Sequence, residues 1–163
     1  MRRKASELPA YQQAMGLLVR REHSKRELKQ KLRQRGKEDG EIVTALETLS
    51  RQDFQNDERF AMALARSRQA AGYGPVRIRA EMAQHSLAAE VITEAIAALP
   101  GDWLETAQGL VARRYLRKIQ SDPAQSRKAV DFLLRRGFEQ KTAYSAVKIT
   151  EWPVEPDLID ESP

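Results

Sequence analysis

The side chains of this sequence that are best suited to chemistry are its lysines and arginines, which number 28 in 163 residues. Arginine outnumbers lysine, and a guanidinium group binds phosphate or carboxylate through two parallel hydrogen bonds. The chemistry that this composition favours is therefore recognition of an anionic partner. The bland alternative is a solvated basic surface that only aids solubility.

Catalytic chemistry has few candidate residues. The sequence has no cysteine, which excludes disulfides, a thiol nucleophile, an iron–sulfur cluster and a thiolate zinc site. Its two histidines, His23 and His85, are too few for a His-rich metal centre and fall at predicted helix ends. No phosphate loop, dinucleotide fingerprint, nucleophile elbow or zinc-protease motif occurs. We therefore expect a protein that is not an enzyme and needs no metal or cofactor.

The charges are divided unevenly along the chain. Residues 1–150 carry 28 basic and 18 acidic side chains, a net charge of +10, whereas residues 151–163 carry five acidic side chains and no basic one. A body of charge +10 indicates an anionic partner, most often nucleic acid. Neither a signal peptide nor an apolar stretch of 18 residues is present. We therefore expect a soluble, cytoplasmic monomer that does not contact a membrane.

The elements that must position these cations are helices. Ala, Leu, Glu, Gln, Arg and Lys dominate, and alternating β-branched runs are absent. Pro75 and Pro123 follow cap-type residues, whereas Gly36, Gly72 and Gly137 lie where helices should end. The pattern predicts an all-α protein with nine helices, at about residues 10–21, 24–35, 39–50, 56–71, 75–85, 88–98, 102–119, 123–136 and 139–149.

The nine predicted helices form a repeat. Shifting residues 24–49 by about 50 positions places Leu28 on Ile78 and Leu32 on Met82, and a further shift of about 51 reaches Leu133. A repeat of this length favours stacked neighbours in an elongated tandem array. We expect a basic arm at residues 1–9, three helix-turn-helix-like units of three helices each at 10–52, 53–100 and 101–150, and a disordered acidic tail at 151–163.

Helical geometry predicts which cations face outward. If Leu28 points inward, Arg26, Arg33 and Lys37 point away from the core and Lys29 lies at its edge. These four cations are candidates for contact with a partner or with DNA. The second and third units supply further candidates, which are Arg66, Arg68, Arg77, Arg79, Arg113, Arg117, Arg127, Lys128 and Arg135.

Two places depart from the repeat. Phe132, Leu134 and Phe138 stand where the first unit has basic side chains, so either a neighbouring helix covers them or they form an exposed patch for a protein partner. We favour the covering helix. The pair His85-Ser86 stands where the other two units have Arg-Gly, so no glycine is available to end the fifth helix.

Several segments carry a family likeness. Residues 56–61 (NDERFA), 66–68 (RSR) and 74–82 (GPVRIRAEM) together resemble the central signature of the bacterial RecX regulators. Residues 24–36 (SKRELKQKLRQRG) resemble that family's first-unit signature. The resemblance covers about residues 10–150, is looser in the third unit, and leaves out the acidic tail.

Resemblance to RecX implies a negative modulator of the RecA recombinase. Proteins similar to this one bind the helical RecA–single-stranded-DNA filament in its groove and block its growth or promote its disassembly. They thereby suppress RecA ATPase, strand exchange and co-protease activity, and some also bind DNA directly. Carried over position by position, the implied contact residues are Lys25, Arg26, Lys29, Arg33, Arg66, Arg68, Arg77 and Arg79.

A second hypothesis belongs to another class. The chain could be a helix-turn-helix-type protein that acts directly on single-stranded or double-stranded DNA, with one helix of a unit in the major groove. The spread of cations over all three units argues against it, because no single helix has an Arg-, Asn- or Gln-rich N-terminal face.

Overall fold

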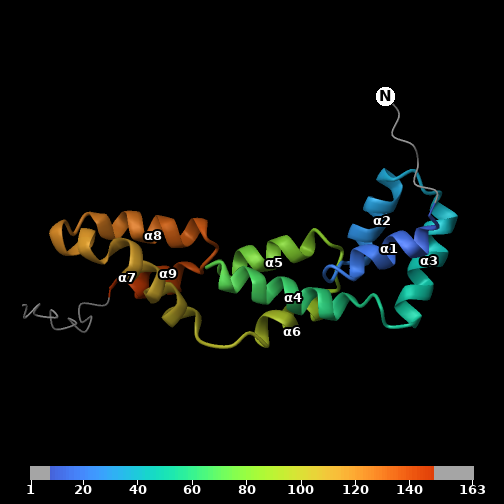
Figure 1. Ribbon diagram of the computed structural model, residues 1–163. Coiled ribbons are helices and arrows are strands. Elements are labelled where there is room, and N and C mark those ends of the chain that lie inside the picture. Colours follow the sequence, from blue (N-terminus) through green and yellow to red (C-terminus); the bar gives the residue numbers. More distant parts are fainter. Residues whose placement is uncertain (1–7, 149–163) are drawn as a thin grey trace, which may run out of the picture. The chain divides into compact units, whose positions relative to one another are not determined.

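The computed structural model describes residues 8–148, and all regular secondary structure in that range is helical (Figure 1). Its helices are α1 (Ala10–Leu18), α2 (Lys25–Gln34), α3 (Asp39–Arg51), α4 (Asp57–Ala70), α5 (Pro75–Ala83), α6 (Ala89–Ala97), α7 (Trp103–Ser121), α8 (Gln125–Arg135) and α9 (Gln140–Val147). The predicted all-α fold with nine helices is thus confirmed over the described range. The expectations for residues 1–7 and 149–163 lie outside the described residues.

The largest difference from the predicted boundaries is at the end of α1, which we placed at residue 21. The helix ends at Leu18 because the amide N–H groups of Arg20 and Arg21 both donate to the carbonyl of Leu17, at 3.1 and 3.4 Å. This turn redirects the chain toward His23, whose side chain is buried. Local periodicity could not predict this turn, because the apolar pattern of the helix does not indicate where the helix ends.

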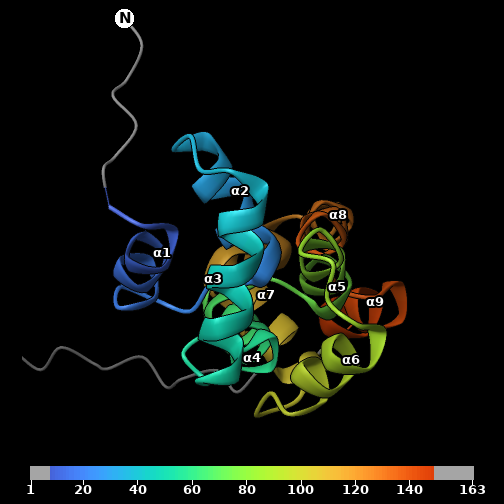
Figure 2. The same cartoon turned by 90° about the vertical axis from the view of Figure 1, so that its right-hand side faces the viewer.

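The helices form two compact units, which are described separately. The first, Met1–Gly101, contains module one (α1–α3) and module two (α4–α6). Within module one, α3 packs against both α1 and α2 (Figure 2), and module two repeats this arrangement, with α6 packed on α4 and α5. The repeat positions Leu28 and Ile78 are both fully buried, as are Leu32 and Met82, which confirms the alignment of these two modules.

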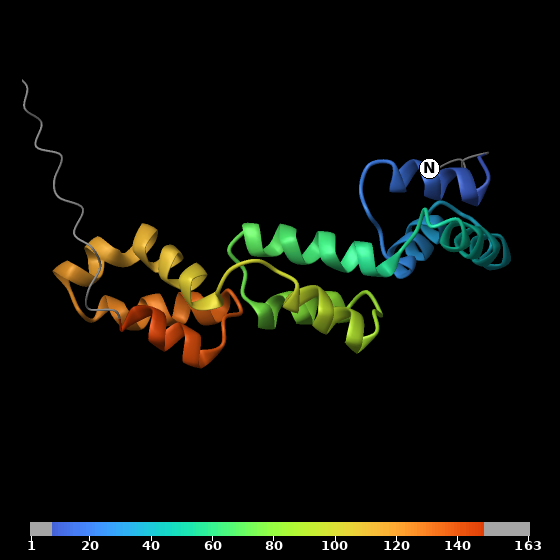
Figure 3. The same cartoon turned by 90° about the horizontal axis from the view of Figure 1, so that it is seen from below.

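The second unit, Asp102–Pro163, contains module three (α7–α9) within its described part. Helix α7 packs against α8 and α9, which also pack against each other (Figure 3). Phe132 and Phe138 are covered, with exposed fractions of 8% and 2%, whereas Leu134 is 39% exposed. The expectation that neighbouring helices cover these positions is therefore confirmed for the two phenylalanines and is wrong for the leucine.

Helix α5 ends sharply despite the lack of a glycine. Ser86 adopts the left-handed conformation, with φ of 57°, at the repeat position where Gly36 and Gly137 have φ of 80° and 85°. Its amide N–H donates to the carbonyl of Ala83 at 3.3 Å. Its hydroxyl oxygen accepts a 2.6 Å hydrogen bond from Nη1 of Arg26 in module one. Serine at this position therefore lacks the conformational freedom of glycine, but its hydroxyl makes a hydrogen bond between the two modules.

The strain at Ser86 can be measured with two substitutions. Both Ser86→Gly and Ser86→Ala remove the hydrogen bond to Arg26, but only glycine relieves the left-handed backbone. We expect the glycine variant to be more stable than the alanine variant by about 1 kcal/mol, measured by urea unfolding. Equal midpoints and slopes for the two variants would contradict strain at this residue.

Candidate binding surfaces

The cations predicted on α2 have different surroundings. Arg33 is held by Asp39, with its Nε and Nη2 donating to the two carboxylate oxygens at 2.6 Å each. Lys37, which we expected to point outward, is only 12% exposed, and its Nζ lies 3.8 Å from Glu41. The projection fails there because α2 ends at Gln34 and the chain turns at Gly36. Lys37 is thus a poor contact candidate, and Arg33 binds a partner only by leaving Asp39.

The N-terminus of α2 serves the junction between modules one and two. The amide N–H of Lys25 donates to Oδ1 of Asp57 in module two at 3.0 Å. The hydroxyl of Ser24 caps α2 by accepting from the amide of Glu27 at 3.1 Å, and it lies 2.9 Å from Nδ1 of His85. The side chain of Lys25 is exposed, whereas Lys29 is half-buried.

The arginines of module two also differ in their surroundings, because some have a carboxylate partner and others do not. Arg68 on α4 donates from Nε and Nη2 to the carboxylate of Glu81 on α5, at 2.7 and 2.6 Å. This pairing holds the pKa of the Glu81 carboxyl below its usual value. Arg77 stacks on the ring of Tyr73, with Cζ 4.6 Å from the ring centroid.

Two further arginines of module two are more accessible. Nη1 of Arg79 reaches the hydroxyl of Thr93 at 3.2 Å at an exposed position. Arg66 is exposed and has no ion pair among the residues that the structure describes. Arg66, Arg77 and Arg79 are therefore the predicted contact residues of module two that a partner can reach without breaking an ion pair.

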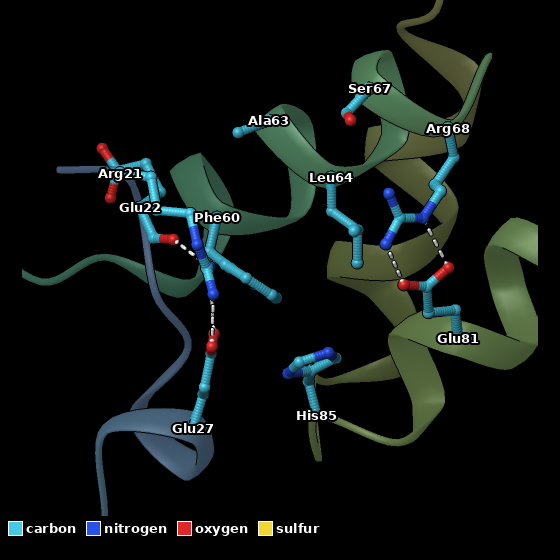
Figure 4. A pocket seen from close by; sticks show the side chains of 10 residues that line it. All are labelled: Arg21, Glu22, Glu27, Phe60, Ala63, Leu64, Ser67, Arg68, Glu81 and His85. Carbon is cyan, nitrogen blue, oxygen red and sulfur yellow. Dashed lines mark hydrogen bonds and ion pairs between the residues drawn. The ribbon is translucent and has the colours of Figure 1, made fainter. Parts of the chain in front are cut away.

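A cleft of about 560 Å³ lies at the junction of modules one and two (Figure 4). Phe60, Ala63 and Leu64 of α4 give it an apolar floor, and the ring of His85 packs on Phe60 with 4.7 Å between centroids. Two ion pairs, Arg21–Glu27 and Arg68–Glu81, lie among the lining residues. This cleft could not be predicted from the sequence, because its residues are brought together from positions up to 64 apart and share no local pattern.

The junction also contains a buried histidine. His23 is 3% exposed, and its Nδ1 lies 3.0 Å from a carboxylate oxygen of Glu27. Burial lowers its pKa below the ordinary value of 6.5, and Arg21 adds to this effect, whereas the charge of Glu27 opposes it. His23 is therefore neutral at neutral pH, and the neutral ring places no charge in the buried junction.

Module three has the most available cations. Residues 102–148 carry ten basic and five acidic side chains, a net charge of +5. Apart from Arg136, none of these cations has an ion pair with another described residue. Two of the acidic side chains act as helix or turn caps, since Asp102 accepts from the amide of Leu104 and Asp122 from that of Ala124. The five cations predicted here are all exposed, namely Arg113, Arg117, Arg127, Lys128 and Arg135.

The sequence analysis missed a group of cations that stack on aromatic rings. Arg114 and Arg136 both lie over the ring of Phe132, at 5.1 and 5.2 Å from its centroid. Lys118 lies 5.5 Å from the centroid of Tyr115, whose ring packs on Phe132 at 5.6 Å. We call these five residues the α7–α8 cation–aromatic cluster. The sequence spacing of Arg114 and Lys118 could have indicated part of this cluster, because residues four apart lie on the same face of a helix.

Residues 8–148 contain neither a metal-binding cluster nor a membrane-spanning helix. No group of three His, Cys, Asp or Glu side chains is placed to hold a metal ion. No helix there combines the length and apolar character that a membrane span requires.

Comparison with known proteins decides the family. Models of the first, second and third three-helix domains of RecX match residues 10–49, 56–96 and 101–147. The chain belongs to the RecX family. The resemblance inferred from residues 24–36 and 56–82 is thereby confirmed, together with the tandem array of three-helix units.

Relatives of known name cover nearly the whole chain. The regulatory protein RecX of Xanthomonas axonopodis pv. citri (strain 306) is 45% identical over 146 residues, which are 90% of each chain. That of Stenotrophomonas maltophilia (strain R551-3) is 46% identical over 138 residues, or 85% of each.

Two crystal structures share the RecX fold. RecX from Lactobacillus salivarius matches with a TM-score of 0.73 at 19% identity, over 85% of this chain and 92% of that one. A second structure, of a regulatory protein RecX, matches with a TM-score of 0.69 at 20% identity, over 82% of this chain and 67% of that one.

A structural role of Arg68 can be distinguished from a binding role by comparison with Arg66. We expect Arg68→Ala to lower the free energy of unfolding by roughly 0.5–1 kcal/mol, because it leaves Glu81 without its partner. Arg66→Ala, on the same helix, should change it by less than about 0.5 kcal/mol. Urea unfolding measures both, and an equal loss for the two variants would contradict a structural role specific to Arg68.

His23 predicts a dependence of stability on pH. Because its pKa is lower in the folded chain than in the unfolded one, the unfolded chain binds more protons around pH 6. The contribution of His23 to stability is therefore fully present well above the ordinary pKa of 6.5, and it is lost as pH falls through the unfolded and then toward the folded pKa. We expect unfolding free energies at pH 7.5 and 5.5 to differ less in His23→Gln than in the unaltered chain. An unchanged difference would overturn this assignment.

Proposed function

We propose that this chain binds the RecA–single-stranded-DNA filament along its helical groove and inhibits RecA ATPase, strand exchange and co-protease activity. It would do so as a cytoplasmic monomer that blocks filament growth or promotes disassembly. The observation that carries the proposal is the match of all three modules to the RecX domains, with 45% identity to a regulatory protein RecX over 90% of each chain. Inhibition of RecA is what membership of this family implies.

The distribution of ion pairs supports contacts of two kinds with such a filament. Modules one and two expose a cleft with an apolar floor, beside which arginines already have carboxylate partners. A surface of this kind suits contact with protein, because few unpaired charges have to be desolvated. Module three instead carries exposed cations such as Arg113, Arg117 and Arg127, which have no ion pair among the described residues and suit DNA phosphates.

Direct action on DNA is the alternative function. One observation favours it: Arg127 and Lys128 are exposed near the start of α8, the second helix of module three. Helix-turn-helix proteins use the N-terminal residues of such a helix to contact bases in the major groove. The two functions differ in whether inhibition requires saturation of the DNA.

The test is hydrolysis of ATP by purified RecA on single-stranded DNA, titrated with this protein, alongside a DNA-binding curve at the same salt concentration. We expect inhibition at well below one molecule per RecA, at concentrations where bare DNA is mostly free. Inhibition that appears only when the DNA is saturated would replace the proposal with direct competition for DNA.

Arg77 and Arg79 are the sharpest test of the contact residues. Both are exposed on α5 and flank the buried Ile78, so Arg77→Glu/Arg79→Glu should preserve the fold. We expect this variant to need about tenfold more protein for half-inhibition of the RecA ATPase, which corresponds to about 1.4 kcal/mol of lost contact energy. Equal inhibition, with unchanged circular dichroism, would exclude these two arginines.

The control for this variant is Arg20→Glu/Arg51→Glu. Both residues are exposed and belong to module one, and the net charge changes by the same amount. This control should inhibit normally, and a comparable loss would mean that net charge alone controls inhibition.

A further inference from the structure

The α7–α8 cation–aromatic cluster has the geometry of an anion-binding surface. Arg114 and Lys118 are exposed, while the rings beneath them are nearly covered, with exposed fractions of 8% for Phe132 and 9% for Tyr115. A guanidinium group stacked on a ring is held in one plane, and its N–H donors at the edge stay free for a carboxylate or phosphate. The two cations therefore approach an anion with part of their side-chain ordering already complete.

Two cations of the cluster, Arg114 and Lys118, are not neutralised by an ion pair within the described part of the chain. Arg114 and Lys118 have no ion pair among residues 102–148, and the range as a whole has a net charge of +5. Asp122, the acidic residue closest in sequence to Lys118, accepts hydrogen bonds from Gln125 and the amide of Ala124, and these bonds lower its pKa. Its carboxylate is thus already engaged at the start of α8.

The same chain contains an anionic segment of matching charge. Residues 151–163 carry five carboxylate side chains and no cation, and the apolar residues Trp152, Val154, Leu158 and Ile159 are interspersed among them. A tryptophan indole can stack on the outer face of a guanidinium group that already covers another ring. The segment therefore complements the cluster both in charge and in chemical character.

The connection allows the segment to reach the cluster. Helix α9 ends at Val147 and packs against both α7 and α8. A chain of 15 residues spans at most about 50 Å, whereas α7, the longest helix of this unit, is about 28 Å long. Attachment to the same unit also gives the segment an effective concentration in the millimolar range, which suffices for a weak charge-based contact.

We propose that residues 151–163 dock on the α7–α8 cation–aromatic cluster and compete there with external polyanions. The segment acts as an internal competitor for the cluster. A ligand with more closely spaced phosphates displaces the segment from it. The competition is electrostatic and weakens as salt rises. This docking does not depend on inhibition of RecA, because the cluster and the segment belong to one chain.

The first experiment compares amide NMR spectra of the full chain with those of a variant in which the five carboxylates become amides, Glu151→Gln, Glu155→Gln, Asp157→Asn, Asp160→Asn and Glu161→Gln. At 50 mM salt we expect shift differences along residues 111–118 and 130–136 as well as in the segment itself. Differences confined to residues 149–163, or spread over α2 or α5 instead, would overturn the proposal.

The second experiment reverses the charge of the cluster. In the chain with its natural acidic segment, Arg114→Glu/Lys118→Glu should abolish the salt dependence of the segment's own amide shifts. Arg51→Glu/Lys141→Glu changes the net charge equally at exposed positions outside the cluster and should leave that dependence intact. An equal effect of the two pairs would show general attraction to a basic body and would contradict a defined docking surface.

The third experiment measures competition with a labelled 15-nucleotide oligothymidylate and needs no RecA. We expect the amide variant to bind it about three- to tenfold more tightly than the full chain at 50 mM salt, with the ratio approaching one at 300 mM. On the Arg114→Glu/Lys118→Glu background this advantage should vanish. Equal affinities of the unaltered chain and the amide variant at 50 mM would overturn the competition, whatever the outcome of the RecA assay.

Discussion

The ion pairs of modules one and two determine which cations of these two modules can contact a partner. Residues 8–101 carry 15 basic and 12 acidic side chains, and Arg21, Arg33, Arg59 and Arg68 each have a carboxylate within 3.1 Å. The pairs themselves contribute little stability, because they are partly exposed. They matter because they decide which arginines are available to a partner. A paired arginine must lose its carboxylate before it can bind a phosphate, whereas Arg66 has no such ion pair to break.

One of these pairs also joins the two modules. Nε of Arg59, on α4, donates to Oε1 of Glu22, in the segment before α2, at 2.9 Å. Close by, Gln55 donates to the carbonyl of His23 at 3.3 Å, and Ser24 is hydrogen-bonded to His85. A junction held by polar groups restricts the angle between two modules more closely than an apolar contact would, because each hydrogen bond has a preferred direction. The neighbouring cleft depends on this fixed angle for its shape.

The sequence predicted those features that depend on local periodicity. The helices, the repeat and the buried positions Leu28 and Ile78 follow from apolar residues at helical spacing, and the structure has them where they were expected. It did not predict the left-handed turn at Ser86, because that conformation is supported by Arg26, 60 residues away. For the same reason it could not separate Arg66 from Arg68, since the carboxylate that distinguishes them lies on another helix.

The repeat explains why module three lacks three of the ion pairs of module one. Shifting module one by 101 positions places Lys128, Gln140 and Thr142 where the acidic residues Glu27, Asp39 and Glu41 stand. The cations that these three residues hold in module one, Lys31, Arg33 and Lys37, are replaced by Phe132, Leu134 and Phe138. Both partners of each pair have thus changed.

These exchanges give module three its different surface. Three carboxylates give way to one lysine and two neutral side chains, and three cations give way to apolar side chains, so the net charge changes only by +1 while three internal ion pairs are lost. Phe132 then provides a ring on which Arg114 and Arg136 stack, so these two cations are ordered by an aromatic surface. Arg114, which is ordered in this way and has no ion pair among the described residues, can attract an anion from elsewhere, and this property distinguishes module three from module one on the same three-helix scaffold.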